Sequence, residues 1–377
     1  MAKTIYVGVG GVARKVKKAY VGVGGVARKV KKAWIGVGGV ARLCYSGGQP
    51  TYLGAITDLS ASMNFGNISP RNSASVGLYG LIVANSSGVA NAYNSSLVRS
   101  TPASINPVRA EVCVSTANGI YALVAGGLIS STVQTAVDAY NTALTRSSPT
   151  GLSVARRRPS SANVGIYALF AGGDDYSSGT RYSTVDVYNT SLTRSIPTGL
   201  NSALLQLAGA CNANFALFGG GYPSSMEVIA YSTSLTRSVP TALSLARYNL
   251  EGTRAGNYAL FAGGCTTASS SSARDTVEAY DASLTRTIPT VLSDARHSPK
   301  GASLGDYALI AGGTSKTNGN HSSVVDCYDD NLTRTVFDLS AGRVNHTAVS
   351  VNDEYVLFAG GVVGGSSGSK VEAFQLV

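Results

Sequence analysis

Residues 167–173 read YALFAGG, and residues 258–264 repeat the same seven letters. An apolar run that ends in two glycines predicts a buried strand followed by a sharp turn, because glycine adopts positive φ without steric cost. Five further segments carry variants of this run; they begin at Tyr79, Tyr121, Phe215, Tyr307 and Tyr355. Successive copies start 42 to 49 residues apart. A repeat of this length, with about four short strands in each unit, is typical of β-propeller blades.

The second half of each repeat is equally regular. A variable stretch follows the glycines, and then comes a short strand of the type VDVY at residues 185–188. In six of the seven units this strand leads into Leu-x-Arg. The double glycine followed by Val-[Asp/Glu]-x-Tyr resembles the kelch repeat over roughly residues 48–377, although Leu-Thr-Arg stands where kelch repeats carry a tryptophan. The resemblance and the period together predict an all-β chain with a kelch-like, seven-bladed β-propeller at residues 48–377.

The seventh unit ends at Val377, directly after its third strand. Residues 56–64 (ITDLSASMN) precede the first unit and are similar to residues 336–344 (VFDLSAGRV), which follow the third strand of the sixth unit. We therefore expect residues 56–64 to supply the fourth strand of the last blade. Such a closure removes an exposed sheet edge and locks the ring.

A second repeat occupies the N-terminus. Residues 6–19 and 20–33 both read YVGVGGVARKVKKA, and a third, decaying copy begins at Trp34. The glycines between β-prone residues predict small hairpins over residues 1–47. The first 50 residues hold ten Lys and Arg and no acid, whereas the remaining chain holds 20 basic and 20 acidic residues. The net charge of +10 therefore belongs to the N-terminal segment.

The tandem 14-residue copies resemble N-terminal segments of structural and tail-associated proteins in phages and prophages of Gram-positive gut bacteria. This resemblance implies a virion protein that is assembled in the cytoplasm of the bacterial host. Residues 1–47 would dock on other virion proteins, with Tyr6, Tyr20 and Trp34 as docking residues, and the propeller loops would bind a host surface glycan or protein. The alternative is an intracellular kelch-type interaction scaffold. Nucleic-acid contact is disfavoured because the basic segment lacks the interleaved aromatic residues of a stacking platform, and self-association is left open.

Two sets of arginines recur with the blades. The Leu-x-Arg arginines lie near an acid on the preceding strand in most units, which predicts cross-strand ion pairs; they are Arg99, Arg146, Arg194, Arg237, Arg286 and Arg334, and the acids are Asp138, Asp186, Glu278, Asp326 and Glu372. The second set falls between consecutive blades at Arg109, Arg156, Arg247, Arg296 and Arg343, with Arg71 nearby in the first unit. Blade four departs from both patterns, with Leu204 and Ile229.

The second set of arginines has two interpretations. A ring of them beside the variable stretches would form a basic mouth for carboxylate or phosphate groups, which makes these arginines candidate ligand-binding residues. Alternatively, each guanidinium is a structural fork that bonds carbonyl groups of the neighbouring blade. The variable stretches themselves are rich in Ser, Thr, Gly and Asn and include Tyr176 and Tyr182, which we take as further candidate ligand-binding residues.

Signals of catalysis and of metal or cofactor binding are weak. The three histidines, His297, His321 and His346, show no metal-ligand spacing, and the five cysteines lie far apart with no Cys-x-x-Cys pair. We expect no catalytic residues, no metal site and no cofactor, and we expect reduced, mostly buried cysteines. The chain has no secretory signal pattern and no apolar run of membrane-spanning length, so we expect no membrane partner.

Overall fold

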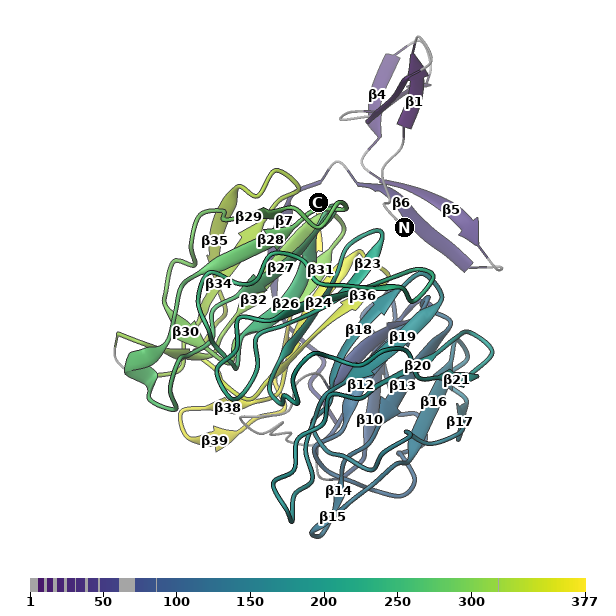
Figure 1. The fold of residues 1–377 in the computed structure, drawn as a ribbon. Coiled ribbons are helices and arrows are strands. Elements are labelled where there is room, and N and C mark those ends of the chain that lie inside the picture. Colours follow the sequence, from purple (N-terminus) through teal and green to yellow (C-terminus); the bar gives the residue numbers. More distant parts are fainter. Residues whose placement is uncertain are drawn as a thin grey trace.

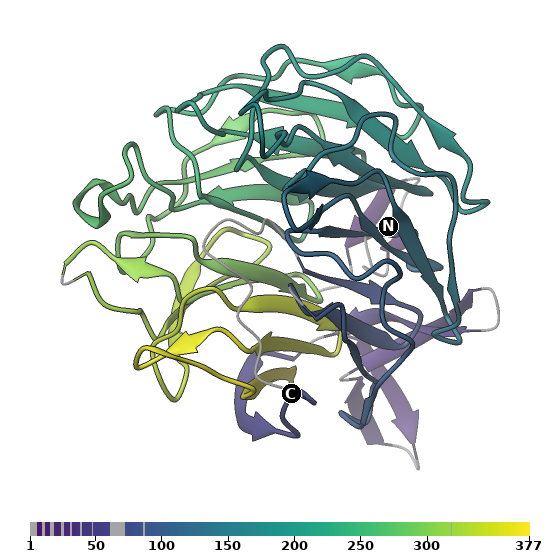
Figure 2. The ribbon, with the colours of Figure 1, turned by 90° about the horizontal axis from the view of Figure 1, so that it is seen from below.

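The computed structural model describes the backbone of six strands within residues 6–46, and it describes residues 48–60, 72–85, 87–317 and 319–377 in full. Seven four-stranded antiparallel sheets are arranged around a central axis (Figures 1 and 2). One short 3-10 helix, η1 (Ser270–Ser272), is the only helix among the described residues. The predicted all-β, seven-bladed propeller is therefore confirmed.

Each blade runs outward from an inner strand at the axis to a short outer strand at the rim. Blade one consists of β8 (Ser73–Val76), β9 (Tyr79–Val83), β10 (Ala90–Tyr93) and β11 (Arg99–Ser100), and blade two of β12 (Cys113–Ala117), β13 (Tyr121–Ala125), β16 (Val137–Asn141) and β17 (Arg146–Ser147). Blade three consists of β18 (Ser160–Val164), β19 (Tyr167–Ala171), β20 (Val185–Tyr188) and β21 (Arg194–Ser195), and blade four of β22 (Ala208–Cys211), β23 (Phe215–Gly219), β24 (Val228–Ser232) and β25 (Arg237–Ser238). Blade five consists of β26 (Glu251–Ala255), β27 (Tyr258–Ala262), β28 (Val277–Tyr280) and β29 (Arg286–Thr287), and blade six of β31 (Lys300–Leu304), β32 (Tyr307–Ala311), β34 (Val324–Tyr328) and β35 (Arg334–Asp338). Blade seven consists of β36 (Thr347–Val351), β37 (Tyr355–Ala359), β40 (Val371–Leu376) and β7 (Pro50–Ile56).

Short ladders decorate the variable stretches and the links between blades. They are β14 (Leu128–Ile129) with β15 (Thr132–Val133), β30 (Arg296–His297) with β33 (Thr314–Ser315), and β38 (Val362–Val363) with β39 (Ser366–Ser367). Isolated bridges repeat the link-to-loop contact elsewhere, for example between Ala110 and Leu128 and between Arg157 and Asp174. Links and variable stretches therefore share one face of the ring, as the sequence predicts; we call it the loop face.

The middle strands are buried on both sides because each blade is covered by two neighbours. In β19, Tyr167 is half-buried and the four residues that follow it are buried. This explains why the sequence shows apolar runs instead of the alternation of a half-exposed strand. The inner strands approach one another closely, and a Cβ atom on Gly209 would overlap the carbonyl oxygen of Ser161 in the adjacent blade.

The double glycines join adjacent blades on the loop face, away from the axis. In the second blade, Gly127 N–H donates to the Arg156 carbonyl oxygen of the next link at 3.0 Å. A Cβ atom on Gly126, whose φ is +66°, would lie 2.5 Å from that same oxygen. Only glycine fits such an approach combined with positive φ, so the YALFAGG repeat encodes both a strand and the contact to the next blade.

The ring closes between the two ends of the propeller. β7 pairs antiparallel with β40, from Leu376 opposite Pro50 to Val371 opposite Ile56. The predicted closure is thus confirmed, but the strand comprises residues 50–56 and not 56–64. Leu59 follows the strand and is buried, as is Leu339 after β35. The similarity between the two segments therefore reflects the link that follows the outer strand more than the strand itself.

The N-terminal repeats form three two-stranded antiparallel hairpins, as predicted. They are β1 (Tyr6–Val9) with β2 (Val12–Lys15), β3 (Ala19–Val23) with β4 (Val26–Val30), and β5 (Lys32–Val37) with β6 (Val40–Ser46). The chain then enters the propeller beside the C-terminus, where Gln49 and Val377 exchange backbone hydrogen bonds of 3.1 Å. This point lies on the face that carries the turns between first and second strands, opposite the loop face; we call it the tether face (Figure 1).

Candidate functional site

The arginines between blades lie inside the protein. Arg109, Arg156, Arg247, Arg296 and Arg343 are at most 1% exposed. Each forms an ion pair with a buried acid on the third strand of the blade that follows it; the partners are Asp138, Asp186, Glu278, Asp326 and Glu372 in that order. No guanidinium of this set faces solvent, so the expected basic mouth does not form and the ligand-binding role of these five residues is wrong. Arg71 lies outside the described residues.

Arg109 shows why burial is tolerated. Its guanidinium lies 2.8 Å from Asp138. It also donates to the carbonyl oxygens of Gly126 and Val124, at 2.6 and 2.9 Å. A guanidinium has five N–H groups in a planar fork, and this site uses them on a carboxylate and on backbone. The structural-fork interpretation is therefore the correct one, and the carbonyls belong to the blade that follows the arginine along the chain.

The acids also bond differently from the prediction. Arg146 does contact Asp138, at 2.6 Å, but Arg194 and Arg334 stand 3.8 and 3.7 Å from their acids. Several Leu-x-Arg arginines donate instead to carbonyl oxygens of the preceding link, as Arg194 does to Gly151 at 2.5 Å. The principal partner of each acid is thus the buried arginine of the link, and the Leu-x-Arg arginine is a secondary one.

The charge state of these pairs follows from burial and pairing. Burial by itself would raise the pKa of Glu278, but hydrogen bonds from Arg247 and Ser244 outweigh it and the pKa is lowered. Glu372 follows the same pattern, with Ser340, Tyr52 and Arg343 lowering its pKa against burial. Both carboxylates are therefore ionised at neutral pH, and each ion pair holds the link against the third strand of the blade that follows it.

Candidate binding residues on the loop face do meet solvent. The Tyr176 side chain is 49% exposed, and the Arg157 guanidinium lies 4.5 Å from the centre of its ring. Arg157 also forms ion pairs with Asp174 at 3.0 Å and with Glu111 at 2.8 Å. Tyr182 is half-buried and donates its backbone N–H to Gly173. Of the two predicted tyrosines, Tyr176 is the one presented at the surface.

A second aromatic pair lies in the adjoining loops. The Arg181 guanidinium stands 5.0 Å from the centre of the Tyr222 ring, and Tyr222 packs edge-on against Tyr248 at 5.3 Å. Asp174 links the two pairs because its backbone bridges to both Arg157 and Arg181. We call these five residues the loop-face cluster: Arg157, Tyr176, Arg181, Tyr222 and Tyr248. Cation–π contacts of this kind contribute roughly 0.5–1 kcal/mol each at exposed sites.

Sequence reasoning missed most of this cluster. Only Tyr176 was predicted, because it lies in one of the variable polar stretches that follow the double glycines. Tyr222 also follows a double glycine directly, and Arg157 belongs to a run of three arginines, so both carried a signal. The missing step was spatial: the bridge of Leu205 to Tyr222 and that of Arg157 to Asp174 bring neighbouring loops together.

The other chemical groups give no further centre. Among the described residues, no group of three or more His, Cys, Asp or Glu is placed to hold a metal ion. Cys113, Cys265 and Cys327 are buried free thiols and Cys211 is half-buried. In the described part of the chain, no helix is long and apolar enough to cross a membrane. The side chains of Tyr6, Tyr20 and Trp34 lie outside the described residues; only their backbone positions in β1, β3 and β5 are defined.

Comparison with known proteins supports the architecture. No protein family matches the sequence, and no curated protein does either. The solved structure of YjhT resembles this chain with a TM-score of 0.57 and 10% sequence identity, over 75% of this chain and 99% of that one. At this identity the likeness shows a shared propeller fold and nothing about activity.

Proposed function

We propose that the protein is a non-catalytic, virion-associated binding protein of a phage, in which residues 1–47 dock on the particle and the loop face binds the surface of the bacterial host. The observation that carries the proposal is the division between the two faces. The chain leaves the propeller on the tether face, whereas the variable loops gather on the opposite one (Figure 1). A body anchored through its N-terminus would then turn its loops outward.

Two further features support this assignment. The tandem hairpins repeat a sequence similar to N-terminal segments of phage structural and tail-associated proteins, and repeated hairpins offer several equivalent docking strands. The loop-face cluster combines two exposed tyrosines, Tyr176 and Tyr222, with arginines, the residue types enriched where proteins recognise other surfaces. Buried ion pairs and inter-blade glycine contacts make the scaffold under these loops rigid, which limits the entropy lost on binding.

Docking is tested by purifying phage particles from cells that produce either the full chain or a chain that begins at residue 48. We expect mass spectrometry to find the full chain on particles and the shortened chain only in the cytosol. Absence of both from particles would overturn the virion assignment and favour the alternative, an intracellular kelch-type interaction scaffold.

Receptor binding is tested separately with susceptible cell walls. The double variant Tyr176→Ala/Tyr222→Ala removes both exposed rings, and we expect at least a tenfold loss of binding, since truncated interface aromatics typically cost 2 kcal/mol or more. Ile196→Ala serves as the matched control, because Ile196 is 54% exposed and follows β21, the rim strand of the same blade as Tyr176. Equal binding by all three proteins would exclude the cluster as the receptor site.

A further inference from the structure

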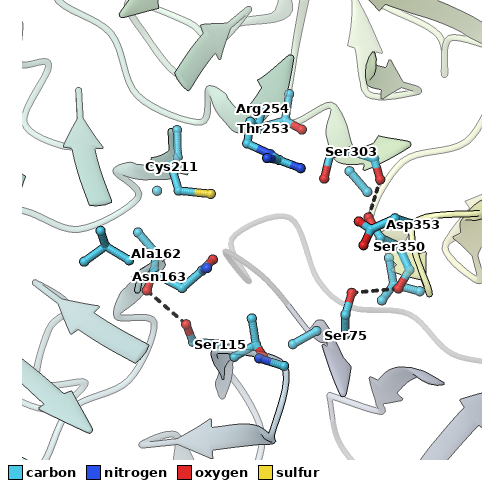
Figure 3. A pocket seen from close by; sticks show the side chains of 18 of the residues that line it. Ser75, Ser115, Ala162, Asn163, Cys211, Thr253, Arg254, Ser303, Ser350 and Asp353 are labelled. Carbon is cyan, nitrogen blue, oxygen red and sulfur yellow. Dashed lines mark hydrogen bonds between the residues drawn. The ribbon is translucent and has the colours of Figure 1, made fainter. Parts of the chain in front are cut away.

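A ring of seven side chains lines the axis of the propeller. Each inner strand carries a half-buried residue at or next to its C-terminal end, and the residue before it is buried. These residues are Ser75, Thr116, Asn163, Cys211, Arg254, Ser303 and Ser350, one from each blade; all except Thr116 are labelled in Figure 3. The repeat thus brings seven side chains of five residue types to one level of the channel, and six of the seven are small and uncharged.

The ring lies in a cavity of about 460 Å³, a volume within the usual range of small-molecule sites. Turn residues of the tether face, such as Asn118, Gly119 and Asp353, also line it. The mouth of the cavity therefore lies on the side where the chain enters the propeller. A receptor bound at the loop face and a ligand in this cavity would therefore occupy separate sites, on opposite faces of the propeller.

Arg254 differs from the arginines that hold the blades together. Arg156 and its equivalents are buried against a carboxylate, whereas Arg254 is half-buried and points into the channel (Figure 3). Its contact with the described residues is a long hydrogen bond of 3.4 Å to the Gly305 carbonyl oxygen, and no ion pair joins it to an acid in the described part of the chain. Most of its N–H groups are therefore available to a ligand, and charge-assisted hydrogen bonds from a guanidinium to an anion are strong.

Neighbouring groups add polar recognition around this charge. Within the described residues, the Asn163 amide and the Ser303 hydroxyl make no side-chain hydrogen bond, and Figure 3 places Ser303 beside Arg254 and Asn163 across the opening. The Ser350 hydroxyl donates to the Ser303 carbonyl and retains lone pairs as an acceptor. The cavity therefore combines one cation with hydroxyl and amide groups that can bond the hydroxyls of a ligand.

We infer that the channel binds a small hydroxylated monocarboxylate, such as a sugar acid, with its carboxylate on Arg254 and its hydroxyls on Asn163 and Ser303. One guanidinium matches one carboxylate in bidentate geometry. Arg254 is the only Lys or Arg among the described residues that line the cavity, so a dianionic phosphate or a polyanion would find a single counter-charge. The ligand is a free small molecule, because the mouth lies on the tether face and not among the outward loops.

The test uses the full chain and three probes: D-glucuronate, neutral D-glucose and dianionic glucose 6-phosphate. Titration calorimetry should show saturable binding of glucuronate and at least tenfold weaker binding of the other two. Arg254→Gln keeps hydrogen-bond donors but removes the charge, and it should weaken glucuronate binding at least tenfold. Arg274→Gln alters a half-buried arginine in the loops, and it should leave the affinity unchanged.

A second readout does not depend on a variant. Cys211 belongs to the ring, so bound glucuronate should slow its alkylation by iodoacetamide at least fivefold, as followed by mass spectrometry of its peptide; glucose should not. Binding of glucuronate with no protection of Cys211, equal affinity in Arg254→Gln, or preference for glucose 6-phosphate would each overturn the inference, as would no binding of glucuronate at all.

Discussion

Blades three and four form the same backbone contact, but the side chains beside it are charged in blade three and apolar in blade four. In blade three, Arg156 and Asp186 form a buried ion pair at 2.8 Å. In blade four the equivalent residues are Leu204 and Ile229, which lie buried in one apolar cluster. The backbone is unchanged, because Leu204 accepts a hydrogen bond from Gly173 at 3.0 Å just as Arg156 accepts one from Gly127. The buried pair is therefore one of two solutions to filling the interior of a blade.

The comparison also shows what the acid does besides pairing. Asp186 accepts the backbone N–H of Ser153 in the link at 2.9 Å. Blade four retains this contact through another residue: Glu227, two positions before Ile229, accepts the N–H of Asn201 at 2.8 Å. Loss of the ion pair in blade four thus comes with a separate acceptor for the link.

The largest expected effect comes from breaking the pair in blade three on one side. Arg156→Leu leaves Asp186 as a buried carboxylate without its main partner, and removal of one member of such a pair typically costs about 3–5 kcal/mol. We expect the free energy of unfolding, measured by urea titration, to fall by that amount. A loss under about 1 kcal/mol would mean that solvent or Arg194 compensates the charge.

A matched variant places the residues of blade four at the equivalent positions of blade three. Arg156→Leu/Thr184→Glu/Asp186→Ile installs both apolar residues and the separate acceptor, since Thr184 occupies the position of Glu227. Apolar replacement of complete buried pairs is often neutral or stabilising, so we expect recovery to within about 1 kcal/mol of the unaltered protein. Failure of the triple variant to recover would show that the two blades are not interchangeable.

An intermediate effect is expected in acid. The pKa of Glu278 is lowered in the folded protein, so its ionised form adds stability above the unfolded pKa of about 4.3, and this contribution is lost as pH falls through the lower folded pKa. In Arg247→Leu/Glu278→Ile, blade five resembles blade four and this titration disappears. Unfolding free energies measured between pH 5 and 3 should decline less steeply in the variant. Parallel curves would contradict the assignment.

The smallest effect concerns the rim. Arg334 is partly exposed and stands 3.7 Å from Asp326, and Arg237 of blade four bonds the Asn201 side chain instead of an acid. Pairs of this exposure contribute roughly 0–1 kcal/mol. Arg334→Ala and Arg237→Ala should each lower the thermal midpoint only slightly and by similar amounts. A markedly larger fall in the thermal midpoint for Arg334→Ala would show that the Arg334–Asp326 pair stabilises the protein more than its distance and exposure indicate.

The fold was predictable because its contacts leave a periodic trace. The first glycine of the pair lies against a carbonyl of the next link in blades two to six, and in blade seven Gly361 lies against the Val344 carbonyl, so the pattern survives in every blade from the second to the seventh. The partners of Asp138 were not predictable in the same way. Arg146 is eight positions away along the chain and Arg109 is 29, and only the folded blade places the distant one deeper.

The channel ring lay beyond sequence reasoning for a related reason. Inner strands such as AGAC in β22 and EGTRA in β26 share little sequence, because close approach of their backbones restricts size at one position and leaves the next position free. No repeated letter marks Arg254 as the equivalent of Cys211 or Asn163. Their common level appears only from the ladder register, in which each pairs with the second residue of the following strand.

The seam between β7 and β40 also sets how the propeller bears mechanical load. β7 starts on the tether face and runs toward the loop face, so a pull on residue 48 against a partner held by the loops acts along the strand. The hydrogen bonds from Pro50–Leu376 to Ile56–Val371 are then strained together in shear and do not open one after another. Because β7 closes the ring in this polarity, tension from the tether loads all the β7–β40 hydrogen bonds at once, the geometry in which a strand pair resists force best. With the opposite strand polarity, the same pull would break these hydrogen bonds one after another.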